Sequence, residues 1–98
     1  MGRRRLIISA RARADLRNIT RHIAKDAPQR AETFAQRLLE QAAKAAEFPY
    51  SGRQVPEFDE SEVREVILAP IRIFYQVRSD DTVMILRFWH SARDKPTF

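Results

Sequence analysis

The chain has 98 residues, the size of one domain with a modest core, so we expect a single domain over residues 1–98. It contains no cysteine, which excludes a disulfide framework and a thiolate metal site. Lys and Arg number 18 against 13 Asp and Glu, and the formal net charge is +5. This excess of positive charge favours an anionic partner, such as nucleic acid, an acidic protein segment or a membrane surface. The alternative is that the charge only keeps the protein soluble.

The start of the chain carries no recognisable targeting or membrane segment. Residues 1–5 are basic, but the apolar run Leu6 to Ile8 is too short for a signal-peptide core or a membrane span. We therefore expect a cytoplasmic protein with no membrane partner. His22 and His90 lie far apart in the sequence, and no cluster of His, Asp and Glu has metal-ligand spacing, so we expect no metal and no other cofactor.

The first half of the chain predicts one strand and two helices. Leu6 to Ser9 is predicted to be a short strand, and the Ser9 hydroxyl can cap the helix that follows by accepting a bond from a free backbone N–H. Apolar residues then recur at helical spacing, at Ala12, Leu16, Ile19 and Ile23.

A second helix is expected from Pro28 to about Glu47, because proline suits a first helical turn and Pro49 stops the helix. Its apolar stripe is Ala31, Phe34, Ala35, Leu38, Ala42 and Ala45. Two amphipathic helices joined by so short a break form an antiparallel hairpin, which has to cover an apolar surface.

The second half predicts that surface as a sheet. Tyr50 to Glu62 contains glycine, proline and several acids and is expected to be a loop. Three strands follow, at Val63–Leu68, Ile71–Arg78 and Thr82–Trp89, and their short connections allow only an antiparallel meander. The fold class is therefore α+β: an N-terminal strand and a two-helix hairpin packed on a mainly antiparallel sheet.

The middle strand alternates between two faces. Ile71, Ile73, Tyr75 and Val77 share the face expected to meet the helices. The opposite face is expected to be open and mixed, with Arg72 and Phe74 beside Met84, Leu86 and Phe88 of the last strand. Apolar side chains on an uncovered face indicate a partner, unless the long loop or the C-terminal tail covers them.

Six stretches occur in an order and at separations that are hard to obtain by accident. They are Ser9-x-x-Ala12-x-x-Asp15-Leu16-x-x-Ile19, Phe48-Pro49-x-x-Gly52-Arg53, Val55-Pro56-Glu57, Val63-Arg64-Glu65, Ile71-Arg72-Ile73-Phe74-Tyr75-Gln76-Val77 and Ile85-Leu86-Arg87-x-x-His90-x-x-Arg93-Asp94. Over nearly the whole chain this pattern resembles the RelE/ParE toxin superfamily. The resemblance implies the toxin of a type II toxin–antitoxin module of the plasmid-stabilisation type, held inactive by a cognate antitoxin, ParD-like or similar, in a hetero-oligomer.

The superfamily has two branches with different targets. RelE-like members are ribosome-dependent endoribonucleases that cut mRNA, and they use strand lysines, arginines and a tyrosine near the end. Here the strand Val63–Leu68 has no lysine and the tail has no tyrosine. If the chain is a nuclease, the resemblance offers Glu65 as base, Arg72 as phosphate clamp and His90 as acid, with Arg93 as a C-terminal arginine.

The incomplete catalytic set and the ending His90-x-x-Arg93-Asp94 favour the ParE branch, whose members inhibit DNA gyrase without being enzymes. The resemblance then gives two sets of candidate contact residues. The target-binding set is Arg64, Arg72, Arg87, His90 and Arg93, and the antitoxin-binding set is Leu16, Ile19, Ile23, Phe74, Arg78 and Met84. Each has a structural alternative; Arg72, for example, could simply pair with Glu65 or Glu57 across the sheet.

Overall fold

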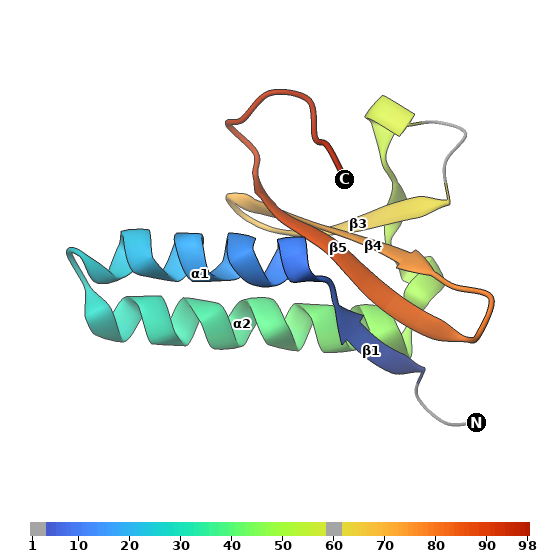
Figure 1. The fold of residues 1–98 in the computed structure, drawn as a ribbon, viewed down its shortest axis with the longest axis horizontal. Helices are drawn as coiled ribbons and strands as arrows, with labels where there is room; N and C mark the ends of the chain where they lie inside the picture. Colours follow the sequence, from blue (N-terminus) through green and yellow to red (C-terminus); the bar gives the residue numbers. More distant parts are fainter. Residues whose placement is uncertain (1–3, 59–61) are drawn as a thin grey trace.

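The computed structural model describes residues 4–58 and 62–98 and has two layers, a helical hairpin and a sheet (Figure 1). In chain order the elements are β1 (Arg5–Ile8), α1 (Ala10–Ala24), α2 (Pro28–Glu47), η1 (Pro49–Ser51), β2 (Arg53–Gln54), η2 (Pro56–Phe58), β3 (Val63–Leu68), β4 (Ile71–Val77) and β5 (Thr82–His90). The sheet order is β1-β5-β4-β3-β2, with β1 parallel to β5 and the other pairs antiparallel. The predicted α+β architecture is confirmed.

Local signals in the sequence account for both helices. The Ser9 hydroxyl accepts a hydrogen bond from the Ala12 N–H at 3.1 Å and caps α1, as predicted. Helix α2 begins at Pro28 and ends at Glu47, also as predicted, although its N-cap residue Ala27 supplies no side-chain bond. The connection between the two helices lies well beyond the end of the sheet in Figure 1, so part of the hairpin has no strand beneath it.

The main core lies between the two layers. Ile71, Ile73 and Tyr75 are at most 1% exposed and pack with Leu38 and Ala42 of α2, so the predicted helix-facing side of the middle strand is confirmed. The predicted loop contains one strand that was missed, because β2 has only two residues and shows no alternation. It pairs with β3 through Arg53 opposite Glu65.

The expectation of an open apolar face on the far side of the sheet is wrong. Phe74 is fully buried in a second cluster with Val55, Val63 and Trp89, with Leu86 packed against it. Phe98 of the tail meets the Phe74 ring edge-on, with centroids 5.2 Å apart, and Pro96 is also fully buried. The loop and the C-terminal tail therefore cover this face themselves.

A bulge in β5 explains a second error on this face. Phe74 lies opposite Arg87 but Tyr75 lies opposite Ile85, so Leu86 is an extra residue that reverses the alternation of the strand. Phe88 therefore packs in the main core against the helices instead of on the far side.

The same region buries Arg87, which was expected to be available to a target. Its Nε and Nη2 donate to the two carboxylate oxygens of Asp15 on α1 at 2.7 and 2.8 Å, and its Nη1 donates to the Thr97 carbonyl at 2.8 Å. Asp15 also accepts the Phe88 N–H at 3.1 Å. Arg87 is 7% and Asp15 9% exposed, so this ion pair joins helix, sheet and tail in the interior.

We predict that Asp15→Ala destabilises the fold strongly, because it leaves the Arg87 guanidinium buried without its carboxylate. Removing one partner of a buried pair costs about 3–5 kcal/mol in free energy of unfolding. Chemical denaturation measures this, and the double variant Asp15→Ala, Arg87→Met should recover part of the loss. A single variant within about 1 kcal/mol of the natural protein would contradict the assigned role.

Candidate functional site

Arg72, the expected phosphate clamp, is held by two carboxylates of its own chain. Its Nε and Nη2 donate to Glu65 at 2.7 and 3.1 Å, and its Nη1 and Nη2 donate to Glu57 at 2.8 Å each. Its guanidinium also lies 4.8 Å from the centre of the Phe74 ring. Glu65 is 1% exposed and accepts a further bond from Arg53 at 3.0 Å. The pairing of Arg72 with Glu65 and Glu57, considered as an alternative from the sequence, is what the structure contains.

This network shifts the pKa of two of its members. The hydrogen bond from Arg72 lowers the pKa of Glu57 from 4.5 to about 2. Hydrogen bonds to Glu57 and Glu65 raise the pKa of Arg72 further above its usual range. Both carboxylate oxygens of Glu65, the expected base, accept hydrogen bonds from guanidinium groups, those of Arg72 and Arg53.

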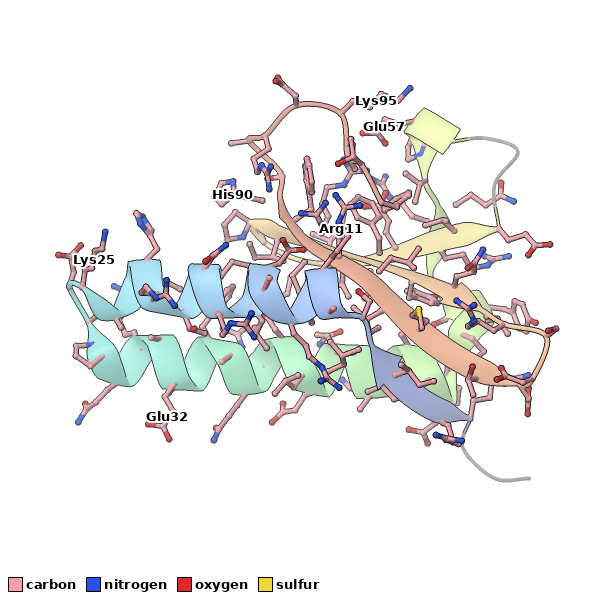
Figure 2. All side chains as sticks on the ribbon, viewed as in Figure 1. Arg11, Lys25, Glu32, Glu57, His90 and Lys95 are labelled. Atoms are coloured by element: carbon pink, nitrogen blue, oxygen red, sulfur yellow. The ribbon has the colours of Figure 1, made fainter. Side chains whose placement is uncertain are left out.

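His90, the expected acid, lies on the other side of the sheet from this network. In the register of β4 and β5, His90 is opposite the helix-facing Ile71, whereas Arg72 is opposite Trp89 of the second cluster. Figure 2 labels His90 at the end of β5, near the helical hairpin, and Glu57 apart from it beside the tail. The structure thus brings Glu65 and Arg72 together but does not bring His90 to them.

His90 and Arg93 instead border a cleft of about 760 Å³ where the helical hairpin passes the end of the sheet. Arg93 is stacked on Trp89, with its guanidinium carbon 3.9 Å from the ring centre. The cleft is lined by Asp15, Asn18, Ile19, His22, Ile23, Arg30, Thr33, Phe34, Arg37, Ala69, Pro70, Ile71, Phe88, His90 and Arg93. We call this feature the hairpin cleft.

Arg64 lies at the opposite end of the sheet. It donates to the Gly52 carbonyl at 2.8 Å and stacks over Tyr50 at 5.4 Å, where it borders a hollow of about 490 Å³ together with Arg78. Arg78 in turn contacts the Met84 sulfur at 3.3 Å.

The candidate contact residues are therefore dispersed. Of the target-binding set, His90 and Arg93 reach the hairpin cleft, Arg64 lies at the far end, and Arg72 and Arg87 are held in ion pairs. Of the antitoxin-binding set, Ile19 and Ile23 line the hairpin cleft, Leu16 packs against the main core and Phe74 is buried.

Sequence reasoning missed the basic residues that α2 contributes to the hairpin cleft. Arg30 and Arg37 are seven residues apart, a spacing that places both on one face of a helix. Asn18 and His22 show the same regularity on α1, four residues apart. This helical spacing can be seen in the sequence, but the sequence alone does not indicate which polar helix face borders a cleft.

Two classes of site find no support within the described ranges. No group of three or more His, Asp or Glu side chains in residues 4–58 and 62–98 is placed to hold a metal ion. In the same residues, neither helix has the length and apolar character needed to cross a membrane.

We predict that Arg72→Ala returns the pKa of Glu57 from about 2 towards 4.5, because the hydrogen bond that depresses it is lost. A depressed carboxyl pKa stabilises the fold above pH 4.5, and that contribution disappears as the pH falls to 2. NMR titration of the side-chain carboxyl measures the shift, with Arg64→Ala as control because Arg64 donates to Gly52 instead. A natural protein in which Glu57 titrates near 4.5 would contradict the network.

Comparisons with known proteins agree with this fold. A search of curated proteins gives no match. The toxin–antitoxin system ParDE of P. aeruginosa contains a chain with 24% identity and a TM-score of 0.74, over 89% of this chain and 95% of that one. The RelBE2 toxin–antitoxin complex of Mycobacterium tuberculosis contains one with 21% identity and a TM-score of 0.69, over 95% and 97%. The model of the ParE toxin of the type II toxin–antitoxin system parDE matches residues 6–95, so the chain belongs to the ParE toxin family.

Proposed function

We propose that this ParE-family toxin inhibits DNA gyrase by binding to it, without acting as an enzyme. The observation that carries the proposal is the state of the groups that RNA cleavage would need. That reaction requires a base for the 2′-hydroxyl, cations for the developing phosphorane charge and an acid for the leaving oxygen. Glu65 and Arg72 form an ion pair with each other, and His90 lies on the opposite side of the sheet from both.

Opening this network for substrate would require the phosphate to displace carboxylates that are already in place. Arg72 makes four charge-assisted hydrogen bonds, and the Glu65 side chain has no exposed surface. A substrate would therefore have to compensate for breaking several ion-pair contacts before any chemistry began. A structural role for Glu57, Glu65 and Arg72, which connect β2, β3, β4 and η2, is the simpler account of the same contacts.

The alternative function, a RelE-like ribosome-dependent mRNA endoribonuclease, keeps one supporting observation. His90 and Arg93 border the same cleft, and His22, Arg30 and Arg37 line it as well, so imidazole and guanidinium groups are available together. These groups could supply an acid and phosphate contacts, but the described residues lining the cleft add only one carboxylate, that of Asp15, which is paired with Arg87.

We also propose a cognate antitoxin as partner, acting in the cytoplasm and forming a hetero-oligomer with this chain. The net charge of +5 favours a partner segment rich in carboxylates. Members of the antitoxin-binding set border two hollows: the partly exposed Ile19 and Ile23 line the hairpin cleft, and the exposed Arg78 lies at the far end of the sheet. The longest dimension of the molecule is 40 Å, so a segment that contacts both places has to wrap around much of the toxin.

We predict that the purified protein inhibits supercoiling by gyrase and causes cleaved DNA to accumulate, while mRNA in a parallel translation assay stays intact. Glu57→Gln serves as a control on the ion-pair network, and it should keep its inhibitory potency within about twofold because Glu57 lies outside the hairpin cleft and outside the target-binding set. Rapid cutting of ribosome-bound message, with gyrase unaffected, would refute the proposal in favour of the nuclease.

A further inference from the structure

The floor of the hairpin cleft is apolar and comes from both layers of the fold. Ile19 and Ile23 of α1 and Phe34 of α2 line it from the helical layer, and Ile71 and Phe88 line it from the sheet. Ile19 and Phe34 pack against the main core but stay partly exposed, because the hairpin extends past the strands that would otherwise cover them. Water therefore contacts apolar surface that a partner could bury.

The rim of the hairpin cleft is basic. Arg30 and Arg37 are exposed, and neither forms an ion pair with any residue in the ranges 4–58 and 62–98. Arg93 and the two histidines border the same opening. The acid in the lining, Asp15, is neutralised by Arg87, so the unpaired charge around the opening is positive.

This combination fits a protein segment better than a nucleic acid. Single-stranded nucleic acid binds to exposed aromatic rings on which its bases stack. Here the partly exposed floor consists of Ile19, Ile23 and a single aromatic ring, Phe34, because Phe88 is only 2% exposed, so the floor offers no row of rings for successive bases. An apolar anchor flanked by carboxylates would satisfy both the floor and the rim, as in helix-in-groove recognition.

We propose that the hairpin cleft is the surface through which the toxin, when it is free of antitoxin, holds gyrase, by docking an acidic segment of that enzyme that carries apolar side chains. The inference rests on the proposed function. It follows from charge complementarity and from the three places where target contact was expected. The far sheet face is covered by the chain itself, and Arg64 lies in a separate hollow with its guanidinium bonded to the Gly52 carbonyl. Only the hairpin cleft brings two members of the set together, His90 and Arg93. The exposed part of the hairpin then serves recognition, and the sheet supports it.

The double variant Arg30→Glu, Arg37→Glu tests the cleft directly. It reverses two unpaired charges at the rim, so the concentration that half-inhibits gyrase should rise about tenfold or more, because like charges across an interface are strongly unfavourable. The matched control is Arg11→Glu, Arg13→Glu, which reverses two exposed arginines on α1 outside the cleft lining. Both pairs change the formal net charge from +5 to +1, since each substitution removes two charges.

The control should inhibit within about twofold of the natural protein, because exposed charges more than a Debye length (about 8 Å) from a contact are largely screened at physiological salt. Equal weakening by both pairs, or full potency of the cleft pair, would overturn the assignment to the cleft. Unchanged thermal unfolding midpoints establish that each variant is folded. A natural protein that leaves gyrase fully active defeats the proposed function itself, so the two failures are distinguishable.

Cross-linking gives a second test that does not depend on charge. Because the chain has no cysteine, Asn18→Cys introduces a single thiol in the cleft lining, and Ala43→Cys introduces one on an exposed part of α2 outside that lining. With a short photoreactive label, the Asn18→Cys protein should cross-link to a gyrase subunit and the Ala43→Cys protein should not. Cross-linking from Ala43→Cys alone would place gyrase elsewhere on the toxin.

Discussion

The buried ion pair between Arg87 and Asp15 determines how the parts of this molecule fit together. Arg87 extends from β5 to the carboxylate on α1, and it also donates to the Thr97 carbonyl of the tail. A guanidinium has enough donors to satisfy both partners at once, which a lysine could not do with the same geometry. The helix layer is thereby fixed against β5, and the tail is fixed over the far sheet face.

Fixing the tail in this way decides which surface remains for a partner. The far face, with Phe74 at its centre, is covered by the loop and the tail, and its Arg72 is held by Glu57 and Glu65. The helical hairpin extends past the end of the sheet (Figure 1). The uncovered apolar surface therefore lies in the hairpin cleft, between the hairpin and that end of the sheet. His90 and Arg93 border this uncovered surface, whereas Glu65 and Arg72 lie together on the other side of the sheet.

The sequence predicted much of the fold because its signals are local. The Ser9 cap, the Pro28 helix start and the alternation from Ile71 to Val77 each depend on a few neighbouring residues, and all were confirmed. The errors concern long-range effects. A bulge at Leu86 reverses the faces of β5, and burial of Arg87 depends on Asp15, 72 residues away. Candidate site residues were chosen by resemblance, which cannot say that Arg72 and His90 lie on different sides of a sheet.

The central claim is that this toxin acts by holding its target through one built surface. Hydrogen exchange on the toxin bound to gyrase measures that surface most directly, because amides at a contact exchange more slowly in the complex. The account predicts added protection over residues 18–23 and 30–37 and at the β3–β4 turn around Pro70, the segments that contribute lining residues to the hairpin cleft. Protection confined to the far sheet face around Glu57 and Arg72 would contradict it.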